Sequence, residues 1–296
     1  MTAFRCATAS RARGDELAGT ASTVRSYLLV EHPGPWGTDA LRDARLPDGL
    51  GDHLQEQSRR HRVRVLLVRR PGRRAGDGPT RVVAARAAGA ASWAEAADLD
   101  RIDDVRDLDL AALGAGRSLG LEPEDAPVLA VCTHGRHDAC CAELGRPVAL
   151  ELASGPHAPA VWEASHVGGD RFAGNLVCLP EGLYFGRVDP GDARQVLAEY
   201  LDGRITLEHY RGRSCHSFPQ QAAERLVRER TGLREIDAVR FVSMQRDDAH
   251  AWTVQFRAGA DELVASVVRE EGAPAFLTCD AKAERRPRRF VATLVS

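Results

Sequence analysis

One stretch of the sequence, from Val131 to Cys141, limits the fold and the chemistry of this chain more than any other. It reads VCTHGRHDACC and holds three of the seven cysteines and two of the ten histidines. The apolar residues 126–131 that lead into it predict a buried strand. Thiols and imidazoles crowded at the end of a strand indicate a metal or redox centre on a loop that the sheet holds in place.

A second polar cluster, SHVGGDRFAGN, begins at Ser165, and in it three residues separate His166 from Asp170. The pattern around the two clusters predicts the order β-α-β-loop-β-β-α, which is the thioredoxin-like arrangement. The expected elements are strand 128–132, a helix restarting at Pro147, strands 160–163, 175–179 and 182–187, and helix 190–200. In that arrangement both clusters lie at one end of the sheet, so we expect them to form one site.

Composition limits the class of protein. The chain has 296 residues, 44% of them hydrophobic and 28% charged, which predicts a soluble globular protein of roughly two or three domains. A net charge of −2 argues against nucleic acid as a partner. We find neither an apolar run of about 18 residues nor the apolar core of a secretory signal, so we expect no membrane span. We therefore expect a cytoplasmic protein, in which structural disulfides are rare.

Three segments are predicted along the chain. Residues 1–120 read as an N-terminal α/β domain, residues 121–205 as the thioredoxin-like domain, and residues 206–296 as a C-terminal α+β region. The first segment shares a coarse strand–loop–helix–strand order with the second, which suggests a degenerate thioredoxin-like unit without ligands. In detail we expect strands 24–30, 63–68 and 80–85 and helices 50–60 and 98–113, then helix 218–231 and strands 238–244, 252–257, 262–269 and 290–295.

The two clusters, read together, resemble a known family. CTHGRHDACC followed by SHVGGDRFAGNLVCLPEGLYFGRV is similar to the sucrase/ferredoxin-like family, and so are LLVEHPGPWG near the N-terminus and YRGRSCHSFPQQAAE near Tyr210. The resemblance implies a thioredoxin-like [2Fe-2S] ferredoxin domain over 121–205. It also implies electron transfer with an unidentified redox protein as donor or acceptor, by a carrier rather than a catalyst. Nothing singles out a pair of glycosidase carboxylates.

The resemblance also implies a ligand set. Cys132 and Cys141 match the first pair of cluster ligands, and His166 matches the first residue of the second pair. Some members of the family have a second histidine where this chain has Asp170. Histidine ligation raises the potential of such a cluster, whereas a carboxylate is a harder and less common ligand for its iron. The fourth ligand is therefore open among Asp170, Cys140 and Cys178.

Two other functions remain open from the residues alone. Cys140 and Cys141 are candidates for a thiol-disulfide redox enzyme or sensor, although C-x-x-C is absent and a disulfide between neighbouring residues is strained. Cys132, His134 and His137, together with Cys140 or Cys141, are candidate ligands for zinc in a zinc-stabilised interaction protein.

Overall fold

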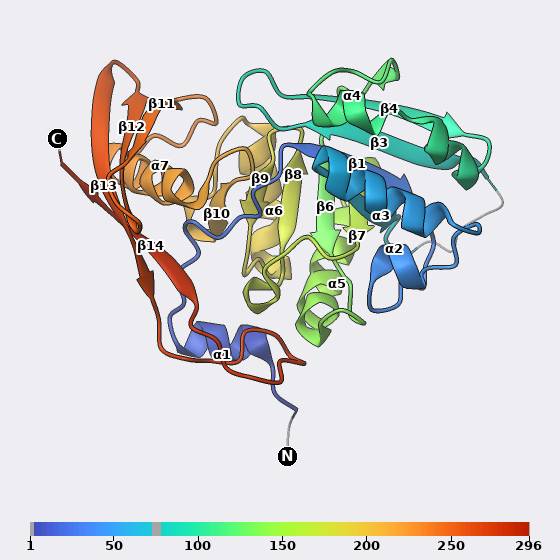
Figure 1. Ribbon diagram of the computed structural model, residues 1–296, viewed down its shortest axis with the longest axis horizontal. Coiled ribbons are helices and arrows are strands. Elements are labelled where there is room, and N and C mark those ends of the chain that lie inside the picture. Colours follow the sequence, from blue (N-terminus) through green and yellow to red (C-terminus); the bar gives the residue numbers. More distant parts are fainter. Residues whose placement is uncertain (1–2, 73–77, 296) are drawn as a thin grey trace.

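The computed structural model describes residues 3–72 and 78–295, and one ten-stranded mixed sheet dominates it (Figure 1). The strand order is β10-β9-β8-β6-β7-β2-β1-β3-β4-β5. The strands are β1 (Ser26–Glu31), β2 (Val63–Arg69), β3 (Thr80–Arg86), β4 (Trp93–Leu99), β5 (Glu122–Pro123), β6 (Val128–Cys132), β7 (Val161–Ala164), β8 (Leu176–Leu179), β9 (Leu183–Phe185) and β10 (Tyr210–Arg213).

The helices lie between and around these strands. They are α1 (Cys6–Ala12), α2 (Ala40–Asp43), α3 (Leu50–His61), α4 (Leu110–Gly114), α5 (Ala139–Ala153), α6 (Pro190–Leu201) and α7 (Phe218–Thr231). Short 3-10 helices occupy Ile102–Asp107, Ala158–Ala160, Asp170–Phe172 and Leu207–His209. Within the described ranges, no helix is both long and apolar enough to cross a bilayer.

The sheet consists of two halves with the same order of elements. In the first half β1 and β2 are parallel and joined through α3, β3 is antiparallel to β1, and β4 is antiparallel to β3. The second half repeats this order with β6, α5, β7, β8 and β9. The halves join where β2 and β7 pair antiparallel, with Val68 opposite Ala164. The coarse order of elements that the sequence suggested for both segments is therefore present, and both halves share a single sheet.

Strand alternation distributes the core over the two faces of the sheet. On one face, α3 and α4 cover the first half around Leu28 and Val30, while α5 and α6 cover the second half around Leu129 and Val131. The other face carries one cluster contributed by both halves, and Cys132 belongs to it. The candidate ligands therefore lie on the side where the two halves pack together.

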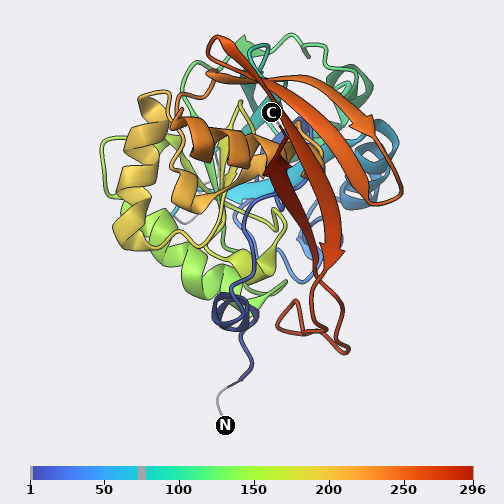
Figure 2. The same cartoon turned by 90° about the vertical axis from the view of Figure 1, so that its left-hand side faces the viewer.

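The C-terminal region forms a second sheet, with strands in the order β11-β12-β13-β14. Its strands are β11 (Val239–Arg246), β12 (Ala251–Ala258), β13 (Asp261–Glu271) and β14 (Arg288–Leu294), all antiparallel and packed on α7. This matches the predicted helix followed by strands. The connection from β13 to β14 leaves the sheet and runs down beside α1 (Figures 1 and 2).

Two predictions about secondary structure are wrong. Pro147 does not restart a helix, because α5 runs unbroken from Ala139 and contains it; the Asp138 side chain accepts from the Cys140 N–H and starts the helix earlier. The helix expected over 98–113 is β4 ending at Leu99, a 3-10 turn and the short α4. The charged residues there are periodic, but Asp98 and Leu99 pair with β3, and the residues that follow form only short helical turns. The division into segments at 120 and 205 stays a prediction.

Candidate metal centre

Three predicted ligands converge at one end of the large sheet. Cys132 is the last residue of β6, Cys141 lies in the first turn of α5, and His166 lies in the loop after β7. Their ligand atoms all lie within 4.8 Å of one another. Both thiols are buried, and the His166 side chain is 21% exposed. The two sequence clusters thus form one site that reaches the surface at the imidazole.

Asp170 and His137 extend this site on its outer side. Asp170 Oδ1 lies 3.0 Å from His166 Nδ1 and 3.5 Å from Cys141 Sγ. The His137 ring stacks on the His166 ring, with centroids 3.9 Å apart. His137, His166 and Asp170 form a second group of donor atoms within 4.8 Å, so the two groups share His166. The sequence pattern indicated His137 only as a candidate ligand in the zinc set with Cys132 and His134.

The packing of α5 places Cys141 against Cys132. A Cβ atom on Gly145 would lie 2.0 Å from the Cys132 carbonyl oxygen. Only glycine therefore lets the helix approach the end of β6 this closely. The close approach brings the thiol from the first turn of α5 next to the thiol at the end of the strand.

A buried arginine holds the loop that carries His166. Arg211 Nη1 donates to the Gly168 carbonyl at 3.0 Å and to Asn175 Oδ1 at 2.7 Å. Asn175 Nδ2 in turn donates to the Gly169 carbonyl at 2.9 Å. Gly168 and Gly169 have φ values of 103° and 86°, which favour glycine. Arg211 is not among the residues predicted for the site. The available signal was its place in the YRGRSCHS motif, which is part of the family resemblance.

The neighbouring ionisable groups of the site shift one another's pKa values. A hydrogen bond from Cys141, together with His166, lowers the pKa of the Cys132 thiol. The same hydrogen bond raises the pKa of the Cys141 thiol. Burial opposes a charge on His166, but Asp170 and Cys132 outweigh it and raise its pKa to about 9. The pKa of Asp170 is lowered by His166 in spite of burial. A metal entering this site would therefore displace protons from Cys141 and His166.

Comparison with known proteins identifies the family. Residues 17–212 match the family model described as sucrase/ferredoxin-like. The chain belongs to the sucrase/ferredoxin-like family. The family region contains both halves of the large sheet, and α7 and the C-terminal sheet lie outside it. No curated protein and no solved structure matched the chain.

Two other candidate ligands lie elsewhere in this sucrase/ferredoxin-like protein. Cys178 is in β8 and packs under α5 and α6, whereas its neighbour Val177 faces the side of Cys132. His134 has both ring nitrogens engaged: Nε2 lies 2.8 Å from the Gly37 carbonyl oxygen, and Nδ1 accepts from the His166 N–H at 3.3 Å. Neither residue is placed to contribute a donor atom.

Cys140 also faces away from the Cys132 site. Its Sγ lies 3.4 Å from Cys279 Sγ, in a separate group of side chains. Adjacent side chains on a helix point about 100° apart, so the thiols of Cys140 and Cys141 lie in different groups of side chains. The structure therefore assembles neither the zinc set built on His134 and His137 nor a Cys140–Cys141 pair.

Proposed function

We propose that this protein is an electron carrier that holds one [2Fe-2S] cluster in a thioredoxin-like domain over residues 121–205. The observation that carries the proposal is the convergence of Cys132, Cys141 and His166 in a member of the sucrase/ferredoxin-like family. The order β6-α5-β7-β8-β9 supports the thioredoxin-like assignment. The same order in the first half supports a degenerate second unit.

The side chains present fit such a cluster. Thiolates suit the iron of a sulfide cluster, and a neutral imidazole suits a more exposed iron. His166 Nδ1 is a buried nitrogen without a hydrogen-bond partner among the described residues, because Asp170 lies close to it but outside hydrogen-bonding geometry. Cys132 and Cys141 would hold one iron, and His166 and Asp170 the other. When bound, the cluster would supply one-electron transfer.

The surrounding residues would do the remaining work. Arg211 and Asn175 fix the loop that presents His166. The half-buried rings of His137 and His166 are the exposed part of the site, so we expect the unidentified redox protein to approach there. The proposal includes a cytoplasmic location, where thiols remain reduced and available as ligands.

Elemental and spectroscopic analysis of anaerobically purified protein tests the proposal. We expect iron and acid-labile sulfide in equal amounts and an electron paramagnetic resonance signal after reduction. A colourless protein without iron and sulfide after reconstitution would contradict it. The compact span of the three donor atoms favours one alternative, a single zinc ion at Cys132, Cys141 and His166. Stoichiometric zinc without labile sulfide at these residues would establish that alternative.

We predict that Asp170→Ala changes the midpoint potential and the resonance spectrum of the cluster. Asp170 contacts both His166 and Cys141, so its carboxylate is the best placed fourth ligand. Potentiometric titration of the variant checks this. His137→Ala is the matched comparison, because His137 touches the same imidazole by stacking, and we expect it to leave the spectrum unchanged. The opposite pattern would assign the fourth position to His137.

A further inference from the structure

A second group of donor atoms lies outside the site described above. It consists of Cys6, Asp138, Cys140 and Cys279, whose ligand atoms all lie within 4.8 Å of one another. Cys6 begins α1, Asp138 and Cys140 begin α5, and Cys279 lies in the connection from β13 to β14. Figures 1 and 2 show that connection beside α1, below the large sheet. Three distant parts of the chain therefore meet at these side chains.

The distances within this group match a tetrahedral metal site. With a zinc–sulfur bond of about 2.3 Å, two thiolates on one tetrahedral ion lie about 3.8 Å apart, and a thiolate and a carboxylate oxygen about 3.5 Å apart. Cys279 Sγ lies 3.4 Å from Cys140 Sγ and 3.7 Å from Cys6 Sγ. Cys6 Sγ lies 3.5 Å from Asp138 Oδ2 and 3.6 Å from Oδ1. The side chains already have nearly the spacing that one ion requires.

The buried carboxylate of this group has no cationic partner in residues 3–72 and 78–295. Asp138 is 1% exposed, and no lysine, arginine or histidine in the described part of the chain forms an ion pair with it. Its two oxygens accept the backbone N–H groups of Cys140, at 2.9 Å, and Cys279, at 2.7 Å. These bonds orient the carboxylate and leave lone pairs for a metal. A buried carboxylate beside three thiols, without a cation, is an arrangement that a metal ion would balance.

We propose that Cys6, Cys140 and Cys279, together with Asp138, bind one zinc ion. Soft thiolates in tetrahedral geometry select zinc, and four protein ligands make a closed, structural site. On binding, each thiol loses its proton to solvent as its sulfur bonds to the metal. The ion would tie α1 and the β13–β14 connection to α5. Cys6 and Cys279 lie outside the family match over 17–212, so the site would join segments on either side of the family region to α5 within it.

Zinc titration of the full-length chain tests the proposal. The Cys132→Ala/His166→Ala double variant is titrated, because it removes a ligand from each of the two donor groups of the first site, which share His166. We expect one zinc ion per chain, and Co²⁺ in its place should show a tetrahedral thiolate spectrum. Cys279→Ser should weaken zinc binding by about 100-fold or more, because one of the ligands is lost. Cys215→Ser is the matched control, since Cys215 is a half-buried thiol outside the group, and it should leave the affinity unchanged.

Three outcomes would overturn the zinc site. They are the absence of zinc and cobalt binding, zinc binding that Cys279→Ser does not change, or a Cys140–Cys279 disulfide in the purified protein by mass spectrometry. Because Cys279 is only half-buried, circular dichroism should show that its variant still folds. The test is independent of the iron–sulfur proposal, since the double variant lacks both donor groups of that site and retains this one.

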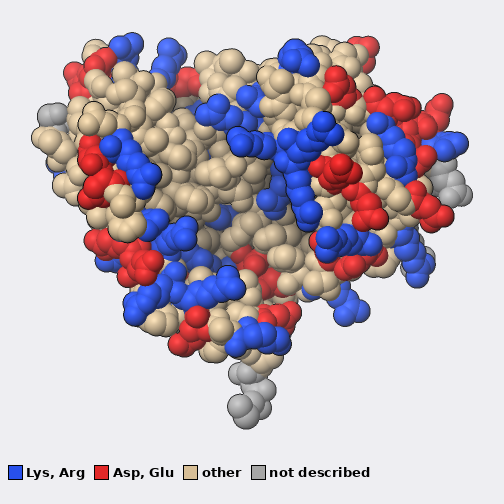
Figure 3. All heavy atoms as spheres, in the orientation of Figure 1, with Lys and Arg blue, Asp and Glu red and all other residues tan. Residues whose placement is uncertain are grey.

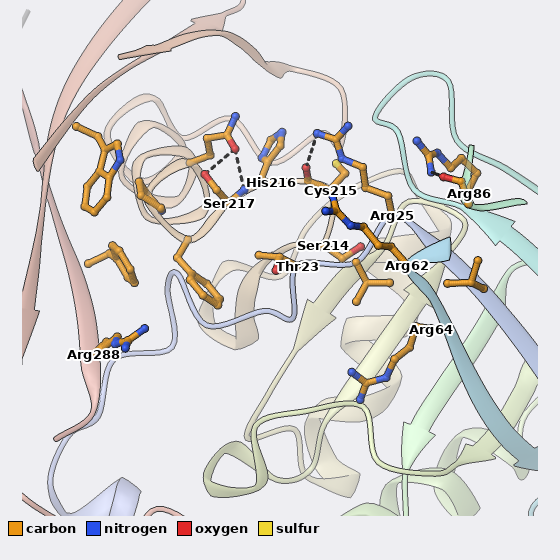
Figure 4. A pocket seen from close by; sticks show the side chains of 18 of the residues that line it. Thr23, Arg25, Arg62, Arg64, Arg86, Ser214, Cys215, His216, Ser217 and Arg288 are labelled. Carbon is orange, nitrogen blue, oxygen red and sulfur yellow. Dashed lines mark hydrogen bonds between the residues drawn. The ribbon is translucent and has the colours of Figure 1, made fainter. Parts of the chain in front are cut away.

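An independent observation concerns a cavity of about 930 Å³ between the first half of the large sheet and α7 (Figure 4). Figure 3 shows basic side chains gathered in this middle part of the surface. Six arginines line the cavity, and its described lining contains no aspartate or glutamate. They are Arg25, Arg62, Arg64, Arg86, Arg269 and Arg288. None of the six forms an ion pair with a described residue.

The start of α7 adds to this positive potential. Ser217 and Phe218 line the cavity, and the first turn of a helix carries a partial positive charge. We infer that the cavity binds a small anion carrying two or more phosphates, for which arginine forks are suited. Arg64 lines the cavity and also donates to the His166 carbonyl at 2.6 Å. The bound anion would therefore lie next to the loop that holds the metal centre.

Calorimetric titration with inorganic pyrophosphate tests the anion site. We expect binding that weakens as salt concentration rises. Arg25→Gln and Arg62→Gln should each lower the affinity by about tenfold or more, as the loss of a charge-assisted hydrogen bond does. Arg146→Gln is the control, since Arg146 is exposed on α5 and does not line the cavity. Absence of binding, an equal effect of Arg146→Gln, or equal affinity for a polyglutamate peptide would overturn the inference.

Discussion

Replacing Cys132 by alanine is expected to abolish cluster binding. Cys132 is buried at the end of β6, and Cys141 and His166 lower the pKa of its thiol, which favours the thiolate that binds iron. Its removal leaves Cys141 without the partner that shares its iron. We expect iron and sulfide to fall to background in anaerobically purified protein, with the visible absorption lost.

Cys178→Ala is the matched control for that loss. Cys178 is also a fully buried cysteine in the second half, but it packs on the opposite face of the sheet under α5 and α6. Its variant should retain iron and sulfide. Retention of the full cluster in Cys132→Ala, or its loss in Cys178→Ala, would contradict the ligand assignment.

Glu224→Gln is expected to destabilise the fold by about 3–5 kcal/mol, the cost of breaking a buried ion pair. Glu224 on α7 is fully buried, and its Oε1 accepts from Arg228 at 2.9 Å. Its Oε2 accepts from the Tyr210 hydroxyl of β10 at 3.1 Å and lies 3.1 Å from His216 Nδ1. The carboxylate therefore links α7 to the edge of the large sheet. Urea unfolding at neutral pH measures the loss.

The control for this prediction is on the same helix. Glu229 pairs with Arg225 at 2.6 Å but is 47% exposed, so Glu229→Gln should cost less than about 1 kcal/mol. Equal losses in the two variants would show that burial of Glu224 is not the cause.

The Glu224 pair should also make stability depend on acid. Burial opposes its ionisation, but Arg228 and Arg213 outweigh burial and hold the pKa of Glu224 well below its usual range. A carboxyl group whose folded pKa is depressed adds stability that is present above its unfolded pKa of about 4.3 and is lost as pH falls toward the folded value. Wild-type protein should therefore lose more stability than Glu224→Gln below about pH 4.

Local pattern was sufficient for most elements of the second half. Each predicted strand from 128 to 187 has a counterpart in β6 to β9, because short apolar runs between turn residues leave few alternatives. In that order β6 and β7 are parallel neighbours, so the loops after them lie at the same end of the sheet. This is why the sequence could place Cys132 and His166 together. The family assignment rested on the same motifs and is confirmed over residues 17–212.

The strands β4, β5 and β10 were missed for a physical reason. β4 has the sequence WAEAADL, whose alanines and acidic residues favour strands weakly, so its conformation depends on pairing with β3. β5 is only two residues long, and β10 contains Arg211 and Arg213, which are buried by tertiary partners. Segments of this kind take their structure from neighbours that the local sequence does not reveal.

The sequence by itself determined that VCTHGRHDACC and SHVGGDRFAGN meet at one end of a sheet. Only the tertiary structure decided which neighbours the adjacent thiols of Cys140 and Cys141 have. Cys141 lies beside Cys132 and His166, whereas Cys140 lies beside Cys6 and Cys279. The reason is that the helix directs adjacent side chains about 100° apart. The partners of each thiol then come from segments up to 273 residues apart, whose meeting depends on packing of the whole chain and leaves no local pattern.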